Sequence, residues 1–425
     1  MGFGTRFIVI AVCTIVTVGA QDAAPAPTAP PSVRQPAVKT PSATPSFSST
    51  PIDTQIVLGL TYIRGSINGS RPLDVVLDSG ASESIVTPQL TEELHLKTEE
   101  TAAAAGPGRG GDNLLHMVHG ATLTLGGTTI VDQTIAALPI DYVAQQAGVP
   151  TDGIFGGNFF TSFVVDEDYT AHTVRLLDSA TFAPSADFVS VAVNLASNVA
   201  FTRLAFRAPD GSELSGIFEI DSGLVADLIF AEPFVKAHPA LLAGKRVDLP
   251  SVTAVGGNMQ IQAGRIQALT LGSFVLKEPV AIFPSNAAGV LANAQIAGIL
   301  GTGVLKRFHV IFDWPHQRML LAPGPDVNIR SPGSCSGLSL RVALPDYHRL
   351  LVKGVIAGSP AAQAGFLAGD VIEAVARGTD ELRPDPGLQL AAVVKELGEP
   401  GQSFAVLIVR QGKPMRLTFL TRELY

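Results

Sequence analysis

One internal repeat constrains the fold of this chain more than any other feature of its sequence. Asp78-Ser79-Gly80 recurs as Asp221-Ser222-Gly223, an offset of 143 residues. Three further anchors recur in the same order at offsets of 145 or 146: "LTLG" at 123–126 and 269–272, "GIFG" at 153–156 with "GILG" at 298–301, and Asp168-Tyr169 with Asp313-Trp314. Four anchors at nearly one spacing predict that residues 52–325 are two copies of one structural unit.

Composition and patterning indicate that these copies are rich in β-strands. The chain has 425 residues, of which 46% are hydrophobic and 16% charged, so about two to three domains with large cores are expected. Glycine is abundant at 42 residues, helix-period patterns are short, and "QIVLGLTYI" from residue 55 alternates as a half-buried strand does. The expected fold class is all-β. A net charge of −8 without a basic run argues against nucleic-acid binding.

The first 51 residues are expected to lie outside the folded body. Residues 1–20 are typical of a secretory signal peptide, with Arg6 before an apolar run that is too short for an ordinary membrane span. Residues 21–51, rich in Pro, Ala, Ser and Thr, predict a disordered tether. We therefore expect an exported protein, periplasmic or extracellular, with an uncleaved N-terminal anchor as the alternative. After signal removal Cys335 is the one remaining cysteine, which leaves no internal disulfide.

The repeat and the composition together predict the domain boundaries. Residues 52–182 form the first lobe, 183–325 the second, 326–334 a Pro/Gly-rich linker, and 335–425 a separate module. Each lobe has a helix candidate shortly after its Asp-Ser-Gly, at 87–96 and 231–241, and Thr87-Pro88 resembles a helix start.

The duplicated Asp-Ser-Gly suggests a particular chemistry. An apolar strand delivers each aspartate to a sharp turn, which glycine permits and which the serine hydroxyl can hold rigid. Two such turns related by approximate twofold symmetry can bring two carboxylates face to face, and such a pair shares one proton. The ionised carboxylate can then take a proton from water while the protonated one polarises a peptide carbonyl.

These segments resemble those of the pepsin/retropepsin-like aspartic proteases, especially bacterial single-chain forms with short lobes. The resemblance covers about 270 residues and rests on "INGSRPLDVVLDSGASESIV" and "GIFGGNFF" in the first lobe, and on "IFEIDSGL" and "GILGTGVL" in the second. It implies a bilobal pair of β-barrels and an aspartic endopeptidase that acts on protein or peptide substrates. The implied site residues are a catalytic dyad of Asp78 and Asp221, with dyad support from Ser79, Gly80, Ser222 and Gly223.

The same resemblance implies segments that support and cover this site. An apolar-apolar-Gly segment is threaded beside each aspartate loop, here Ile154, Phe155 and Gly156 in one lobe and Ile299, Leu300 and Gly301 in the other. Residues 106–120 fall in the interval of the mobile hairpin that covers the cleft of the family, although they contain no tyrosine.

Glu219 departs from the pattern, because Val76 holds the equivalent place in the first copy. Strand alternation puts Glu219 on the same side as Asp221. It either points toward the dyad, as a third carboxylate that raises the apparent pKa values of the site, or reaches solvent at an open edge of the lobe. The second interpretation is favoured. The alternative function is a catalytically inactive, protease-like scaffold that binds peptides.

The C-terminal module resembles the PDZ domain in "SPAAQAGFLAGDVI". This resemblance implies that the backbone of Gly337, Leu338, Ser339 and Leu340 binds the C-terminal carboxylate of a peptide, which adds as a strand between the following strand and a helix at 387–397. The module either binds peptide termini, regulates access to the cleft, or serves only as a packing unit.

No cofactor or metal is expected. "GPGRGG" at 106–111 lacks the βαβ setting of a nucleotide site, His116 and His119 have no completing ligands, and "GSCSG" at 333–337 has no partner set for a catalytic thiol.

Overall fold

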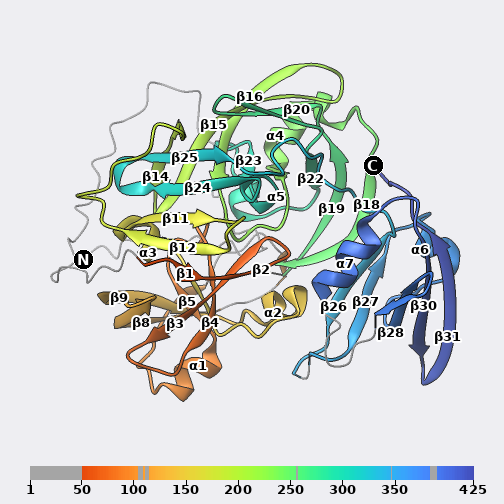
Figure 1. Cartoon of the computed structure of the whole chain (residues 1–425), viewed down its shortest axis with the longest axis horizontal. Coiled ribbons are helices and arrows are strands. Elements are labelled where there is room, and N and C mark those ends of the chain that lie inside the picture. The colour runs from red at the N-terminus through yellow and green to blue at the C-terminus, as the bar shows by residue number, and fades with distance from the viewer. Residues whose placement is uncertain (1–49, 104–108, 111–113, 255–256, 346, 383–389) are drawn as a thin grey trace.

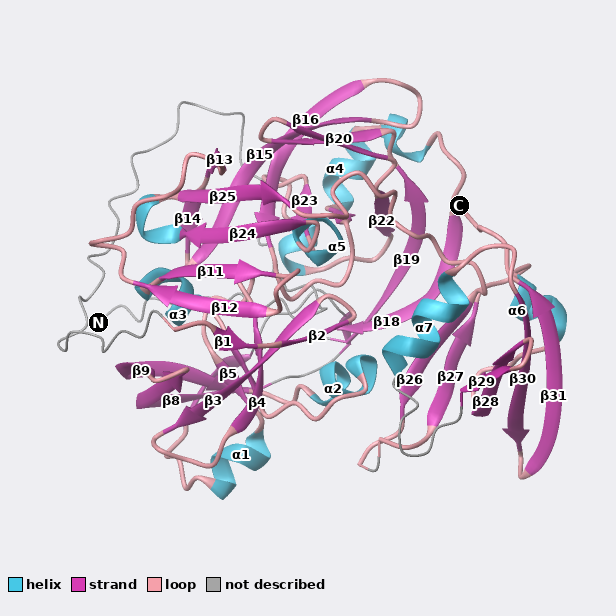
Figure 2. Ribbon diagram, in the orientation of Figure 1, coloured by secondary structure: helices cyan, strands magenta, loops and turns pink. Residues whose placement is uncertain are grey.

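The computed structural model describes residues 50–103, 109–110, 114–254, 257–345, 347–382 and 390–425. The expected signal peptide 1–20 lies outside the described residues, as does the expected tether 21–51 except for its last two residues. The described chain is mainly β, with short helices at the ends of strands (Figures 1 and 2). None of its helices combines the length and apolar composition that a membrane crossing requires.

A closed barrel of six strands, here called the first barrel, forms early in the described chain. Its strands follow the order β3-β4-β10-β5-β9-β8, and β8 pairs back with β3 through Leu125 and Gly65. The pairings β4–β10 and β5–β9 are parallel. The eight-stranded sheet that contains this barrel consists of β2 (Gln55–Val57), β3 (Leu60–Ile67), β4 (Leu73–Leu77), β10 (Gly153–Phe155), β5 (Ile85–Val86), β9 (Thr128–Ala137), β8 (Leu114–Leu125) and β6 (Glu99–Ala103).

The second half of the repeat forms an eleven-stranded sheet, here called the second sheet, with a comparable centre. β16 pairs in parallel with β23, as β4 does with β10. Unlike the first barrel, it is left open by the pairings among described residues, so two closed barrels are not observed. Its members are β18 (Val247–Ala254), β19 (Gly257–Arg265), β22 (Val280–Pro284), β17 (Leu228–Phe230), β23 (Gly298–Leu300), β16 (Glu213–Ile220), β15 (Val199–Arg207), β20 (Ala268–Leu271), β21 (Phe274–Lys277), β14 (Asn194–Ala196) and β7 (Arg109–Gly110).

A six-stranded sheet, here called the bridging sheet, joins the two halves of the repeat. β11 of the first half pairs with β24 of the second, with Asp168 opposite His309. Because strands of both halves share this ladder, the two halves cannot separate without breaking backbone hydrogen bonds. The strand order is β1 (Ile52–Asp53), β12 (Thr173–Leu177), β11 (Val164–Asp168), β24 (Phe308–Asp313), β25 (Arg318–Pro323) and β13 (Val189–Ala192).

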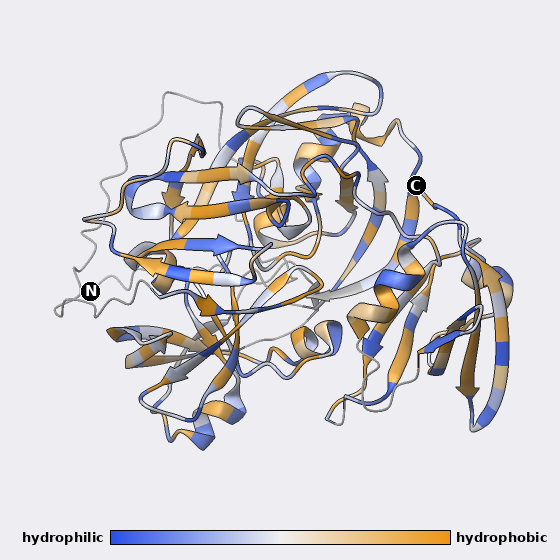
Figure 3. Ribbon diagram, viewed as in Figure 1, coloured by the Kyte–Doolittle hydropathy of each residue, from blue (hydrophilic) through white to orange (hydrophobic). Residues whose placement is uncertain are grey.

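The last part of the chain forms a separate antiparallel sheet, here called the C-terminal sheet, at one side of the body (Figure 1). Hydrophobic residues follow one another along β30, where buried and less buried positions alternate (Figure 3). One face of the sheet packs on α7 (Leu390–Gly398) around buried Val393 and Leu397. Its strands are β26 (Leu338–Val342), β27 (Leu350–Val355), β28 (Val371–Arg377), β30 (Ser403–Arg410) and β31 (Lys413–Leu420), with β29 (Asp380–Leu382) beside β28.

The helices are short, and the expected start at Thr87 is confirmed. The Thr87 side chain accepts a hydrogen bond from the amide of Leu90, and Pro88 takes the first helical position. The helical segments are α1 (Pro88–Glu93), α2 (Asp141–Ala147), α3 (Gly157–Ser162), α4 (Glu232–Ala237), α5 (Thr302–Leu305), α6 (Pro360–Ala364), α7 (Leu390–Gly398) and the 3₁₀ turns η1 (Pro239–Leu242), η2 (Gly289–Ala292) and η3 (Trp314–His316). The first three residues of the helix expected at 387–397 lie outside the described residues.

Candidate active site

The two Asp-Ser-Gly segments follow equivalent strands of the repeat. Asp78 comes directly after β4 and Asp221 directly after β16. The amide of Asp78 donates to the carbonyl of Phe155 at 3.0 Å, and the amide of Asp221 donates to the carbonyl of Leu300 at 3.0 Å. The segments 154–156 and 299–301 therefore lie beside the two aspartate loops in the same way.

The support segments leave no room for side chains at their glycines. A Cβ atom at Gly156 would lie 2.6 Å from the carbonyl oxygen of Ala81, and one at Gly301 would lie 2.4 Å from that of Ala226. Glycine is required at both places because the backbone of the support segment touches the backbone of the aspartate loop.

Reciprocal hydrogen bonds between the two serines join the aspartate loops. The amide of Ser79 donates to Oγ of Ser222 at 2.9 Å, and the amide of Ser222 donates to Oγ of Ser79 at 3.0 Å. The hydroxyls in turn donate across the pseudo-twofold axis, Ser79 to the carbonyl of Ile220 at 2.9 Å and Ser222 to that of Leu77 at 3.2 Å. All four bonds are buried, so they hold both loops in one relative position.

The carboxylates of Asp78 and Asp221 meet at this junction. The amides of Gly80 and Gly223 donate to the Oδ1 atoms of Asp78 and Asp221 at 2.8 and 2.7 Å. Both Oδ2 atoms are buried and lack a hydrogen-bond partner among the described residues. A Cβ atom built on Gly80 would lie 2.6 Å from Cγ of Asp221, which shows how closely the loops approach.

Burial makes this pair difficult to ionise. It raises the pKa of Asp78 to about 7, against the opposing effect of the Gly80 amide hydrogen bond. Burial also raises the pKa of Asp221 well above its ordinary value, with additional contributions from the charges of Asp78 and Glu219. Between these two ionisations the pair carries one proton and one negative charge.

The position of the Glu219 side chain contradicts the expectation from the sequence. The favoured interpretation placed its carboxylate in solvent at an open edge, but the side chain is fully buried. β16 is an interior strand, flanked by β15 and β23, so no edge is available. Glu219 therefore contributes a third carboxyl group beside the dyad, and its charge acts on Asp221.

The segment expected to cover the cleft is described in part. Residues 106–108 and 111–113 lie outside the described residues. Arg109 and Gly110 form β7, which pairs antiparallel with Asn258 and Gly257 of β19. Backbone from the first half of the repeat thus reaches the second sheet at this point.

The four residues expected at the carboxylate loop of the C-terminal module lie at one end of its sheet. Gly337 has a φ of +82° in the left-handed region, and Leu338, Ser339 and Leu340 begin β26. β26 is an edge strand, and α2 of the first half of the repeat contacts it (Figure 1). Arg341 donates to Oε1 of Gln145 on α2 at 3.1 Å, which attaches the module to the first half of the repeat.

Sequence reasoning missed a polar network beneath the second aspartate loop. Asp227 is buried, accepts a hydrogen bond from the amide of Val280 at 2.7 Å, and pairs with Arg307 at 3.4 Å. Ser331 donates to the same carboxylate. The signal was available, since Asp227 is a charged residue in the otherwise apolar run that follows Asp221.

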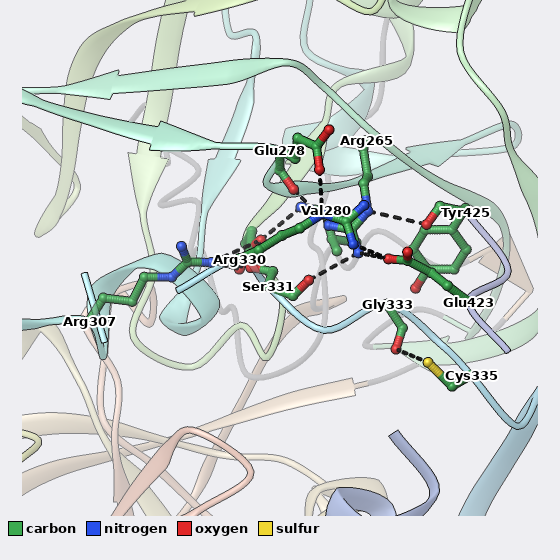
Figure 4. A network of polar contacts seen from close by, with 11 residues as sticks. Arg265, Glu278, Val280, Arg307, Arg330, Ser331, Gly333, Cys335, Glu423 and Tyr425 are labelled. Atoms are coloured by element: carbon green, nitrogen blue, oxygen red, sulfur yellow. Dashed lines mark hydrogen bonds and ion pairs between the residues drawn. The ribbon is translucent and has the colours of Figure 1, made fainter. Parts of the chain in front are cut away.

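This network continues to the end of the chain (Figure 4). Arg265 donates to the carbonyl of Ser331 at 3.0 Å, to Glu423 at 2.7 Å and to the carbonyl oxygen of Tyr425 at 3.2 Å. Arg330 pairs with Glu423 as well. The C-terminal residues are thereby held to the second sheet.

A match to a known protein family covers the first half of this site. Residues 63–159 match the aspartyl protease family, a range that contains Asp78 and its support segment but not Asp221. The crystal structure of an aspartic proteinase from Irpex lacteus is similar over 66% of this chain and 99% of that chain, with 14% identity and a TM-score of 0.37. None of the curated proteins matches the chain.

Proposed function

We propose that the protein is an aspartic-type endopeptidase whose dyad is Asp78 and Asp221. The observation that carries the proposal is the reciprocal hydrogen bonding of Ser79 and Ser222, which brings two buried aspartates to one point. The match of residues 63–159 to the aspartyl protease family supports it. Substrates are protein or peptide chains, since the chemistry acts on an amide bond.

The proposed reaction needs no covalent intermediate. The ionised carboxylate of the pair takes a proton from a water molecule as its oxygen bonds to the peptide carbonyl carbon. The protonated carboxyl gives its proton to the carbonyl oxygen, and a tetrahedral diol forms. The carbon–nitrogen bond then breaks as the departing nitrogen takes a proton from the dyad. One hydroxyl of the diol gives its proton to the dyad as the carboxylic acid forms, so one proton is again shared between the two groups.

The test is cleavage of an unfolded protein by the full chain between pH 3 and 8, with fragments identified by mass spectrometry. The double variant with Asp78→Asn and Asp221→Asn is the control for a contaminating peptidase. Equal cleavage by this variant contradicts the proposal.

The second candidate function is a non-catalytic peptide-binding scaffold. The specific observation in its favour is the departure at Glu219, which adds a buried carboxyl to a site that otherwise has two. Peptide binding without cleavage at any pH supports the scaffold and contradicts the endopeptidase.

Replacement of Gly80 by alanine is expected to lower kcat/KM about 100-fold, because the added methyl group displaces the carboxylate of Asp221. The measurement is peptidase activity together with thermal unfolding. Gly398→Ala is the matched control, since a Cβ there meets nothing within 4 Å. A Gly80→Ala variant with ordinary activity contradicts the proposed position of Asp221 in the site.

For residues 335–425 we propose a PDZ domain that binds peptide C-termini through Gly337–Leu340. A peptide that adds as a strand beside β26 must share that edge with α2, because α2 contacts the same strand. Peptide binding is therefore coupled to the contact between the module and the first half of the repeat.

A hexapeptide that ends in valine is expected to bind the full chain at least tenfold more tightly with a free carboxylate than with an amidated terminus, because hydrogen bonds to charged groups are the stronger ones. Isothermal titration measures both. Gln145→Ala, which removes the acceptor of the Arg341 hydrogen bond, is expected to raise the affinity. Equal affinity of the two peptides contradicts carboxylate capture.

We also propose that the protein is exported. The proposal rests on the signal-like residues 1–20 and on the tether composition of residues 21–51.

A further inference from the structure

Glu219 occupies a position where the fold otherwise places an apolar side chain. On β16, Phe218 and Ile220 belong to the main core, so alternation directs Glu219 to the opposite face. There it is paired in register with Ile299 of β23, a member of a small apolar cluster. A carboxyl group is therefore held in apolar surroundings beside the dyad.

The first copy of the repeat shows what this position usually requires. Val76 is paired in register with Ile154, as Glu219 is with Ile299. Val76 and Ile154 belong to one hydrophobic cluster, so a valine satisfies the position fully. Burial of an unpaired carboxyl costs free energy, so folding alone does not explain a glutamate there.

No group among the described residues compensates Glu219. Both of its carboxylate oxygens are buried and without a hydrogen-bond partner. The paired residue on β15 is Phe201, and the basic residues on the same face of that strand, Arg203 and Arg207, are both exposed. β23 contributes no charged residue, since it consists of Gly298, Ile299 and Leu300.

The charged groups coupled to Glu219 are thus the two aspartates of the dyad, in one direction each. Asp78 acts on Glu219, and Glu219 acts in turn on Asp221. The three carboxyl groups form one coupled system in which each ionisation makes the next more difficult.

We propose that Glu219 is a positioning residue that, once ionised, keeps the remaining proton on the dyad and so extends peptidase activity to higher pH. The proposal rests on the proposed function. It assigns Glu219 no contact with substrate. Its effect is electrostatic, through the proton that the dyad must retain in order to protonate the peptide carbonyl.

The directions and causes of the pKa shifts support this role. Burial raises the pKa of Asp78 to about 7, and burial with the charge of Asp78 raises the pKa of Glu219 to about 8. The pKa of Asp221 is raised by burial and then by the charges of Asp78 and Glu219. Because the charge of Glu219 raises the pKa of Asp221, an ionised Glu219 opposes loss of the last proton of the dyad. The acid limit, set by the first ionisation of the dyad, does not depend on a charge at Glu219.

The test compares the pH profiles of kcat for the wild type, Glu219→Gln and Glu219→Val, the second of which restores the residue of the first copy. In both variants the alkaline limb of the profile is expected to move to lower pH. The comparison is made at the alkaline pH where the wild type has half its maximal kcat. There each variant is expected to have roughly one tenth of the kcat that it has at its own optimal pH. The acid limb is expected to stay in place. Glu219→Asp, which keeps an anion, is expected to restore part of the alkaline limb.

An alkaline limb that is unchanged or moves upward in both variants overturns the inference, as does a parallel shift of both limbs. A merely structural role lowers kcat at every pH and lowers the temperature of unfolding, without moving one limb alone. If the wild type cleaves no substrate, the proposed function fails. If the wild type is active and the profiles coincide, only the role of Glu219 fails.

Discussion

Asp78→Asn and Asp221→Asn are each expected to lower kcat on a peptide substrate by roughly 1,000-fold or more. Asparagine can neither take a proton from water nor give one to a carbonyl oxygen, so each variant lacks one half of the proton exchange. Because the two groups act as a unit, the double variant is expected to be hardly less active than either single one. The measurement is steady-state kinetics at the optimal pH of the wild type.

The controls for these variants separate chemistry from folding. The control is Asp74→Asn. Asp74 lies on β4, the strand that precedes Asp78, but it is partly exposed and paired with Arg64, so little change in activity is expected. Ordinary activity in either dyad variant contradicts the proposed dyad.

The Asp78→Asn variant is also expected to change the way in which folding stability depends on pH. The pKa of Asp78 is about 7 in the folded chain and about 4 in the unfolded chain. Between these pH values the folded chain binds more protons than the unfolded chain, so the free energy of unfolding falls as the pH rises. Asp78→Asn removes this fall in stability, because asparagine does not ionise. Its temperature of unfolding, relative to the wild type, is therefore expected to be higher at pH 8 than at pH 4.

Arg307→Ala is expected to lower the free energy of unfolding by about 3–5 kcal/mol. Arg307 and Asp227 are both almost fully buried, and removal of the cation leaves the Asp227 carboxylate buried without its charged partner. Loss of the hydrogen bond from Arg307 to the carbonyl of Ile329, 2.9 Å long, adds to the effect. Denaturant unfolding followed by the fluorescence of Trp314, the single tryptophan and a buried one, measures the change.

Two variants define the origin of that effect. Arg330→Ala removes an arginine of the same network whose partners, Glu278 and Glu423, are partly exposed, and a loss of about 1 kcal/mol or less is expected. Asp227→Asn combined with Arg307→Met removes both charges and is expected to recover part of the lost stability. Equal effects of Arg307→Ala and Arg330→Ala contradict a special cost for the buried pair.

Much of the architecture could be predicted from short-range patterns. Alternating apolar residues indicated strands, and Thr87-Pro88 marked the start of α1, because both signals arise within a few residues of the chain. The repeated Asp-Ser-Gly indicated that Asp78 and Asp221 belong to equivalent positions. Closure of the first barrel but not of the second sheet could not be predicted, because it depends on pairings such as Gly65 with Leu125 between distant strands.

The sequence by itself determined the two-copy plan, the mainly β composition and the residue types available to the candidate site. Only the tertiary structure decided the surroundings of Glu219 and Asp227. Glu219 was expected in solvent, but β15 and β23 enclose its strand, and Arg307 reaches Asp227 from 80 residues away. The physical reason is that burial and charge pairing depend on which distant strands pack together, whereas strand and turn formation depend on neighbouring residues.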